Sequence, residues 1–316
     1  MIKRCELNPI LSAKDIPYQA DLIFNAGVAK IDGQYVMLFR NDYLKDKSVI
    51  KVSTNLGIAR STDGVHFVAD PQPCFAMQTE EIERIYDPRL QVIEGEIYIC
   101  FAMDTKHGLR GGIAKTDKEF KTFDILSLSA PDNRNMVLFP EKINGKYARL
   151  ERPFPVYSTG GEHFDIWYSD SADLKYWGNT NLVLGAEKVP FCNSKIGPAA
   201  PPVKTDKGWL TTFHAVKKVE PKKNGWEEFW SKEYYAGIML LDLDDPSKVI
   251  GMYDKPLIAP EADYETQGGF RNDVIFPGGM ILEEDGEVKI YYGAADAVEC
   301  LATANVDDLI SLCLKR

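Results

Sequence analysis

Short segments in which apolar and aromatic residues alternate with polar ones run through the whole chain, separated by Gly, Asp and Asn. This period of two is typical of β-strands, and long stretches with the helical period of 3.6 are scarce. A two-domain α/β fold with a parallel sheet needs helix-length segments between its strands, and the chain has none. The pattern therefore predicts an all-β fold.

A unit of strands recurs five times, centred on a turn glycine that precedes an aromatic-rich strand. The five turn glycines are Gly33, Gly95, Gly145, Gly208 and Gly286. A short apolar strand that opens on a polar residue precedes each glycine, and a further strand closing in an acidic turn follows most copies. Because Asp side chains in such turns cap their own backbone, we assign these turns a structural role. The repeat predicts a five-bladed β-propeller that forms a single domain over residues 1–316.

In a propeller the first strand of each blade lines the central channel, so the polar residues that open these strands should face one pocket. Four such residues are Asn25, Asp87, Lys195 and Asp273. The middle strands end on polar residues that we expect at the same end of the channel, namely Arg40, Asn41, Asp42, Asp104, Arg149, Arg152, His214 and Asp296. Carboxylates, amides and nearby aromatic rings suit a carbohydrate ligand, because sugars offer both hydroxyls and an apolar C–H face.

Asp87 lies in the segment RIYDPRL, residues 84–90, between two arginines. It could form a turn, pair with Arg84 or Arg89, or act as a catalytic acid. Because a proline restricts the residue before it, we expect Asp87 to be extended and to open its strand. Glycoside hydrolysis normally needs two carboxylates, whereas inverting phosphorolysis needs only the acid, since phosphate is itself the nucleophile.

Phosphorolysis also requires cations that hold a phosphate dianion beside the scissile bond. The candidates are Arg60, Arg149, Arg152, Lys195 and His214. Each could instead pair with a neighbouring acid, and for any one of them alone the two interpretations are about equally good. Several cations on the channel of a chain with a formal net charge of −10 favour an anionic ligand.

The composition argues against other classes of protein. The net charge of −10 and the lack of a long basic run argue against nucleic acid as a partner. No apolar stretch has the length of a signal peptide or a membrane span, so we expect a cytoplasmic protein without a membrane partner. The six cysteines lack a Cys-x-x-Cys motif and the four histidines lack ligand spacing, which predicts neither a metal site nor a disulfide framework.

An ordered set of segments resembles the β-mannoside phosphorylases of glycoside hydrolase family 130. In chain order the segments are NAGVAKIDGQYVMLFR, GIARSTDG, YDPRL, ARLERP, KIGPAAPPV, GWLTTFHAV, YYAGIMLLDLDDP, NDVIFPGGMI and YYGAAD. The resemblance implies a five-bladed propeller and an inverting attack of phosphate on a β-mannoside, which releases α-mannose 1-phosphate. It implies inorganic phosphate as co-substrate and no cofactor.

The same resemblance assigns roles to individual residues. Asp87 becomes the general acid, acting through a hydroxyl of the bound mannose. The phosphate pocket would be formed by Arg60, Arg149, Arg152, Lys195, His214 and Tyr235. Substrate contacts are expected from Asn25, Asn41, Asp42, Asp273, Tyr292 and Asp296. Family hydrolases lack part of the basic set, and every basic position is filled here, which favours a phosphorylase.

Two alternatives remain at this point: an inverting β-mannoside hydrolase on the same fold, and a glycan-binding propeller without catalysis. The short segment before NPIL favours β-1,4-mannooligosaccharides or mannosyl-N-acetylglucosamine as substrate. Family acceptor subsites are usually built from loops and neighbouring subunits, so we expect a homo-oligomer. Residues 219–235 could serve the acceptor site or the subunit contact, or could equally be a solvated hairpin.

Overall fold

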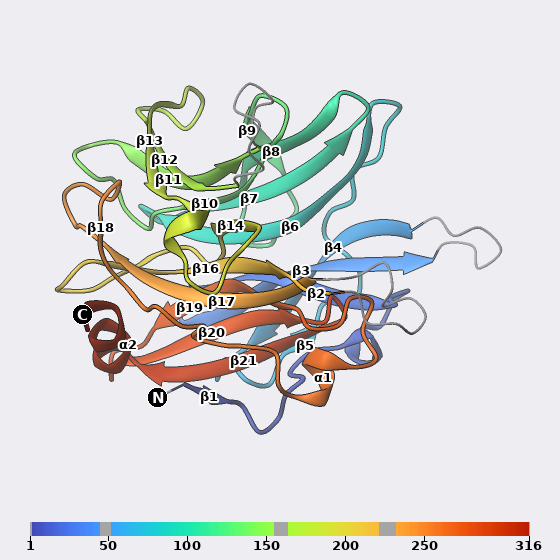
Figure 1. Cartoon of the computed structure of the whole chain (residues 1–316). Coiled ribbons are helices and arrows are strands. Elements are labelled where there is room, and N and C mark those ends of the chain that lie inside the picture. The colour runs from blue at the N-terminus through green and yellow to red at the C-terminus, as the bar shows by residue number, and fades with distance from the viewer. Residues whose placement is uncertain (1, 45–51, 155–163, 221–231, 316) are drawn as a thin grey trace.

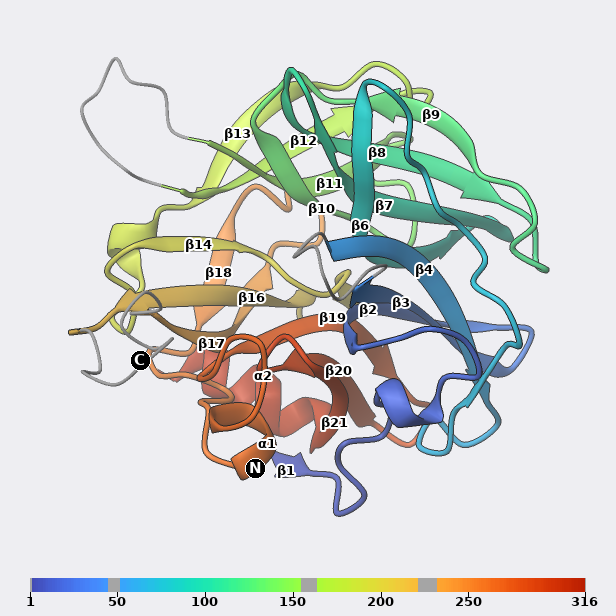
Figure 2. The same ribbon diagram turned by 90° about the vertical axis from the view of Figure 1, so that its right-hand side faces the viewer.

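Five antiparallel sheets surround a central axis in the computed structural model, which describes residues 2–44, 52–154, 164–220 and 232–315 (Figures 1 and 2). Each sheet is built from strands that follow one another along the chain, apart from one strand contributed by the N-terminus. The prediction of an all-β, five-bladed propeller is confirmed. Residues 221–231, within the segment considered for the acceptor site, lie outside the described residues.

The first two blades are continuous in sequence, and in each the strands run in order from the axis to the rim. Blade one consists of β2 (Leu22–Ile31), β3 (Gln34–Leu44), β4 (Val52–Ser61) and β5 (Val68–Ala69). Blade two consists of β6 (Ile82–Ile93), β7 (Glu96–Thr105), β8 (Gly108–Thr116) and β9 (Asp124–Leu128). The inner strands β2 and β6 are those predicted to line the channel.

Blades three and four follow the same plan. Blade three consists of β10 (Asn133–Leu138), β11 (Tyr147–Pro153), β12 (Ile166–Ser171) and β13 (Gly178–Leu184). Blade four consists of β14 (Lys195–Pro198), β16 (Trp209–Lys218), β17 (Lys232–Leu241) and β18 (Val249–Met252), with β15 (Val203–Lys204) paired to β16. Single 3₁₀ turns, η1 (Ala13–Asp15) and η3 (Ala186–Lys188), lie between strands.

Both ends of the chain build blade five, which joins them and closes the ring (Figure 1). Its strands are β19 (Ile275–Leu282), β20 (Glu287–Ala294), β21 (Val298–Asn305) and, at the rim, β1 (Lys3–Arg4). Two helices accompany it, α1 (Asp263–Thr266) and α2 (Val306–Leu314). Among the described helices, none combines the length and the apolar character that a membrane span requires.

The inner strands of the first three blades each contain a β-bulge, at which the ladder to the next strand shifts register. At each bulge a polar residue adopts a left-handed backbone: φ is 55° at Asn25, 50° at Asp87 and 59° at Asn135. Bulges redirect side chains, and Asn and Asp tolerate this conformation better than most residues. The bulges thus turn three polar side chains toward the axis.

The expected extended conformation of Asp87 is therefore wrong. β6 begins at Ile82, so Asp87 lies inside its strand and does not open it. Pro88 disfavours right-handed helical backbone at Asp87, but the left-handed region remains open to an aspartate at a bulge. Local sequence rules could not choose between the two conformations, because the bulge depends on how β6 pairs with β7.

Candidate active site

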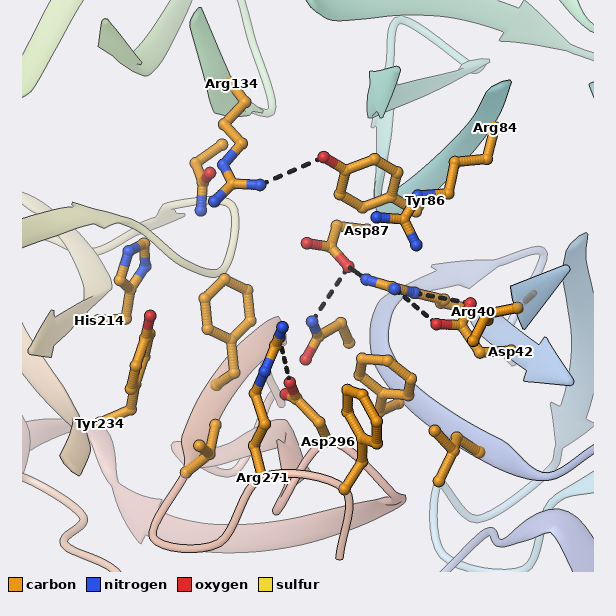
Figure 3. A pocket seen from close by; sticks show the side chains of 18 of the residues that line it. Arg40, Asp42, Arg84, Tyr86, Asp87, Arg134, His214, Tyr234, Arg271 and Asp296 are labelled. Atoms are coloured by element: carbon orange, nitrogen blue, oxygen red, sulfur yellow. Dashed lines mark hydrogen bonds and ion pairs between the residues drawn. The ribbon is translucent and has the colours of Figure 1, made fainter. Parts of the chain in front are cut away.

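A cavity of about 360 Å³ opens at one end of the propeller axis, and all five blades contribute to its lining. Its walls carry a mixture of acids, cations and rings, as Figure 3 shows. The lining residues are Leu22, Phe24, Asn25, Arg40, Asp42, Val52, Arg84, Tyr86, Asp87, Arg134, Asn135, Arg152, Lys195, His214, Tyr234, Phe270, Arg271, Val274, Phe276 and Asp296.

Asp87 lies near the middle of this cavity, between the acid-rich and the basic side (Figure 3). Its Oδ1 accepts hydrogen bonds from Asn25 Nδ2 at 3.0 Å and from Arg40 Nη1 at 3.1 Å. Within the described residues its Oδ2 makes no hydrogen bond. Burial acts to raise the pKa of Asp87, but the charges of Arg40 and Arg89 and the Asn25 amide outweigh it, so the pKa falls below its ordinary value.

Arg40 connects Asp87 to a second carboxylate on the same side of the cavity. Its Nε and Nη2 donate to the two oxygens of Asp42 at 2.9 and 2.5 Å, a bidentate arrangement that fixes the plane of the guanidinium. The rings of Phe24 and Tyr86 lie 4.5 and 4.9 Å from the Arg40 guanidinium carbon. Arg40 therefore neutralises part of both acids and holds Asp87 in a fixed position.

Four basic groups form the opposite side of the cavity: Arg134, Arg152, Lys195 and His214. Arg152 Nη1 lies 3.1 Å from His214 Nε2, and since a guanidinium can only donate, this imidazole nitrogen must accept. Arg152 Nε and Nη2, Arg134 Nε and His214 Nδ1 are buried without a hydrogen-bond partner in the described part of the chain. Buried donors without partners are rare in proteins, which makes this cluster chemically distinctive.

Burial and neighbouring positive charges lower the pKa of three of these groups, Lys195, Arg152 and His214. The pKa of Lys195 falls to about 6, through burial first and then the charges of Arg152 and Arg134. Burial and Arg134 lower the pKa of Arg152 to about 9, and burial and Arg152 lower that of His214 well below its usual range. An anion would satisfy the free donors and remove the repulsion, so the cluster is suited to a phosphate-sized anion.

A third side of the cavity is formed by the segment before blade five and by the end of β20. Arg271 Nη1 donates to Asp296 Oδ2 at 2.9 Å, and burial raises the pKa of Asp296. Phe270, next to Arg271, keeps 53% of its surface exposed although it lines the cavity. An exposed ring at the cavity mouth can pack against the C–H face of a sugar.

The cavity brings together many of the residues predicted from sequence. Those in its lining are Asn25, Asp42, Asp87, Arg152, Lys195, His214 and Asp296. The predicted residues that are absent from its lining are Arg60, Arg149, Tyr235, Asn41, Asp273 and Tyr292. Among the described residues, no group of three or more His, Cys, Asp or Glu side chains is arranged to hold a metal ion.

Two of the predicted residues, Asn41 and Tyr235, do not line the cavity because successive side chains of a strand point to opposite faces. Arg40 and Asp42 line the cavity, whereas Asn41 between them bonds to Asn55. Tyr234 lines the cavity, whereas its neighbour Tyr235 donates to Glu233.

The other absent residues have partners elsewhere in the fold. Arg149 donates to Glu151 at 2.8 Å inside blade three, and Arg60 pairs with Asp70 at 3.6 Å near the rim of blade one. Tyr292 donates to the buried Glu265. The carbonyl of Asp273 accepts the Tyr234 N–H at 2.9 Å, so this residue supports the cavity wall through its backbone.

Sequence reasoning missed Arg134, Tyr234 and Arg271 and did not place Arg40 or Tyr86 in the binding set. Tyr86 and Arg134 share a position that only the structure reveals. Phe24, Tyr86 and Arg134 each stand one position before a left-handed bulge residue, and all three line the cavity. Of the alternatives considered for Asp87, an ion pair with Arg84 does not form, since Asp87 pairs with Arg40 and Arg84 donates to Asp104 at 2.8 Å.

Comparison with known proteins assigns the chain to a family. A family model described as β-1,4-mannooligosaccharide phosphorylase, of glycoside hydrolase family 130, matches residues 3–315. The chain belongs to glycoside hydrolase family 130. The resemblance noted in the sequence is thereby confirmed, and the protein is an enzyme of the mannoside phosphorylase family.

Individual family 130 relatives differ in the linkage given in their names. The chain is 31% identical over 318 residues to 1,2-β-oligomannan phosphorylase of Thermoanaerobacter sp., covering 98% of each chain. It is 34% identical over 325 residues to β-1,4-mannooligosaccharide phosphorylase of Ruminococcus albus, covering 98% of this chain and 90% of that protein.

A third family 130 relative is known in structure. The chain is 34% identical to β-1,2-mannobiose phosphorylase of Listeria innocua over 241 residues, which is 76% of this chain and 63% of that protein. The solved structure of this relative with β-1,2-mannobiose superimposes with a TM-score of 0.84 at 27% identity, over 99% of both chains. The propeller of this chain is thus shared with a relative over its full length.

Proposed function

We propose that this protein catalyses the inverting phosphorolysis of a β-mannoside, releasing α-mannose 1-phosphate, with Asp87 as general acid. The observation that carries the proposal is the pairing, in one cavity, of a fixed carboxylate with a cluster of buried basic groups, of which Arg134, Arg152 and His214 have free donors. The cavity of about 360 Å³ is of a size that suits a small ligand.

In this proposal the phosphate is held by Arg134, Arg152, Lys195 and His214. The free donors of Arg134, Arg152 and His214 form hydrogen bonds with phosphate oxygens, and the two charged guanidinium groups fix the direction of attack. The bound dianion also cancels the repulsion that lowers the pKa of Lys195. Arg60, Arg149 and Tyr235, which the resemblance assigned to phosphate, have no part in this pocket.

The sugar occupies the space between the cation cluster and the acidic side of the cavity. A phosphate oxygen forms a bond to the anomeric carbon while the bond from that carbon to the glycosidic oxygen breaks. The leaving oxygen takes a proton from a mannose hydroxyl, which is reprotonated by Asp87, as the family resemblance implies. In this proposal Asn25, Asp42 and Asp296, which line the cavity, bind the sugar hydroxyls.

The substrate class follows from the family, and the linkage is the finer part of the proposal. The names of the relatives divide between β-1,2- and β-1,4-mannosides. Sequence analysis favoured β-1,4-mannooligosaccharides or mannosyl-N-acetylglucosamine, and these head the panel to be tested. We also propose that the protein is a homo-oligomer with neighbouring subunits near the acceptor site. Light scattering after gel filtration measures the number of subunits.

The decisive experiment incubates the protein with β-1,4-mannobiose, β-1,2-mannobiose or mannosyl-N-acetylglucosamine, with and without phosphate. Phosphate-dependent formation of mannose 1-phosphate from at least one substrate is expected. Free mannose that accumulates at equal rates in both buffers, without sugar phosphate, would identify a hydrolase. Binding of these sugars without any turnover would identify a glycan-binding propeller.

A further inference from the structure

Two buried ionisable side chains, Arg89 and Glu299, lie close to Asp87 without lining the cavity. Arg89 is 4% exposed and follows Asp87 by two positions on β6. Glu299 is fully buried on β21 of blade five. Burying such groups is unfavourable unless they form specific bonds, so the bonds that they form are informative.

Arg89 and Glu299 hold the two ends of the same peptide group. Arg89 Nη1 donates to the carbonyl of Asn25 at 3.1 Å, and the N–H of Ala26 donates to Glu299 Oε1 at 2.7 Å. The Asn25–Ala26 peptide directly follows the left-handed residue of the blade-one bulge. We call Arg89 and Glu299 the peptide clamp.

Arg89 extends the clamp to other blades. Its Nη1 also donates to the carbonyl of Pro88 at 2.8 Å, and its Nε donates to the carbonyl of Ala199 in blade four at 2.7 Å. The packing leaves little free space, since a Cβ on Gly278 would lie 1.9 Å from the Ala26 oxygen. One guanidinium thus joins the bulge of Asn25, the bulge of Asp87 and blade four.

The clamp acts on the catalytic acid through the Asn25 side chain. Asn25 Nδ2 donates to Asp87 Oδ1, and since a carboxylate only accepts, this orientation of the amide is fixed. If the peptide after Asn25 turned, the left-handed backbone would relax and the amide would move away from Asp87. The orientation of the Asn25–Ala26 peptide therefore determines whether the Asn25 amide keeps its hydrogen bond to Asp87.

We propose that Arg89 and Glu299 are positioning residues that fix the Asn25–Ala26 peptide and thereby hold the Asn25 amide against Asp87. This inference rests on the proposed role of Asp87 as general acid. The clamp keeps Asp87 Oδ1 bonded, which leaves Oδ2 to exchange the proton with the substrate hydroxyl. Neither residue touches the substrate in this arrangement.

Substitutions of Glu299 test the clamp, because one variant can keep the oxygen that accepts the Ala26 N–H while another removes it. Burial raises the pKa of Glu299 to about 8, so at pH 7 it is mainly a neutral acid whose Oε1 still accepts the Ala26 N–H. Glu299→Gln keeps an acceptor of the same shape, whereas Glu299→Leu removes it. Glu283→Gln is the matched control, since Glu283 pairs with Lys30 and Lys289 outside the cavity lining.

The measurements are kcat and KM for both substrates and the pH dependence of kcat/KM. The charged groups that influence Asp87 are Arg40 on β3, Arg89 on β6, Arg134 on β10, and Asp296 and Glu299 of blade five. Loss of the Asn25 donor raises the pKa of Asp87, so the limb on which activity falls as Asp87 deprotonates moves to higher pH.

For Glu299→Leu we expect a loss of about 10- to 100-fold in kcat, the effect of one hydrogen bond to a charged group, with the phosphate KM nearly unchanged. The pH limb should move up by about 1 unit. Glu299→Gln should stay within about twofold of the wild type, because its amide oxygen preserves the bond. Glu283→Gln should change thermal stability alone.

A lower thermal midpoint of Glu299→Leu with unchanged kcat and pH profile would overturn the inference, because a structural role predicts that result. Equal losses in Glu299→Gln and Glu299→Leu would overturn it too. If the wild type shows no phosphorolysis, the proposed function is wrong, but the clamp is not yet tested. Crystal structures of the Glu299 variants then test the clamp. An unmoved Asn25–Asp87 contact in Glu299→Leu would reject the clamp.

Discussion

Replacing Lys195 by methionine should make the protein more stable in phosphate-free buffer, although it removes a proposed ligand of phosphate. Burial and the nearby Arg152 and Arg134 lower the pKa of Lys195 from 10.5 to about 6. At pH 7 the unfolded chain holds a proton on Lys195 that the folded protein mostly gives up. This difference in proton affinity costs the folded state about 3 to 5 kcal/mol. Methionine has a similar length and no amine.

The lowered pKa of Lys195 determines how the stability of the folded protein changes with pH. Between pH 6 and pH 10.5 the unfolded chain binds more protons at this site than the folded protein, so the stability of the wild type rises with pH over this range. The advantage of Lys195→Met is thus largest at or below pH 6 and shrinks toward pH 10. Since the entropy of unfolding is about 2.1 cal/mol/K per residue, one kcal/mol corresponds to about 1.5 °C in a chain of 316 residues. Partial relaxation reduces the gain, so we expect a rise in the thermal midpoint of about 3–7 °C at pH 7.

Scanning calorimetry in chloride buffers with and without phosphate measures both halves of this prediction. Phosphate at 100 times its dissociation constant should stabilise the wild type by about 2.7 kcal/mol, and Lys195→Met should lose most of this gain. Lys118→Met serves as control, because Lys118 is an exposed lysine that pairs with Asp32. The control should leave the phosphate response intact.

Two results would refute this reasoning. A lower thermal midpoint for Lys195→Met in phosphate-free buffer would mean that the ammonium stabilises the fold. An undiminished stabilisation of the variant by phosphate would place the anion away from the cluster of Arg134, Arg152, Lys195 and His214.

Three further substitutions test separate parts of the site. Asp87→Asn should lower kcat by at least about 10²-fold while phosphate still raises the thermal midpoint, and normal turnover would contradict the assignment of the acid. Arg152→Ala should raise the KM for phosphate about tenfold or more and that for the mannoside much less, whereas equal effects in initial-rate assays would indicate a structural role. Phe270→Ala should raise the KM for the mannoside about 3- to 10-fold with the phosphate KM unchanged, and an unaltered mannoside KM would exclude sugar stacking there.

The five-bladed fold could be predicted because its signal is repeated. The turn glycines and the strands around them recur in every blade, so an error in one copy is corrected by the others. The sequence did not predict that β1 (Lys3–Arg4) is the rim strand of blade five, since a strand of two residues is too short to show an alternating pattern. Its place is decided by pairing with β21, at the other end of the chain.

The site could be predicted only in part, because sequence locates a residue on a strand more easily than on one of its faces. Arg40 and Asp42 could have been separated from Asn41 by strand alternation. At the bulges alternation fails, and residues before and after the irregularity, such as Tyr86 and Asp87, both reach the cavity. Arg271 lies in a segment without regular secondary structure, where no periodicity could point to it.

The surroundings of Asp87 favour its ionised form, although a general acid must carry a proton. This low proton affinity favours phosphorolysis over hydrolysis. Arg40, Arg89, Asn25 and Arg134 keep the pKa of Asp87 low, so without an anion the group is ionised and has no proton to give. A phosphate dianion bound beside Arg134 would cancel part of the positive potential that lowers this pKa, and a bound sugar would exclude water and raise it further. Water that enters the cavity without phosphate then meets a carboxylate that cannot protonate the leaving group. In the proposed mechanism the nucleophile therefore helps to prepare the acid, and Asp87 acts without a second catalytic carboxylate.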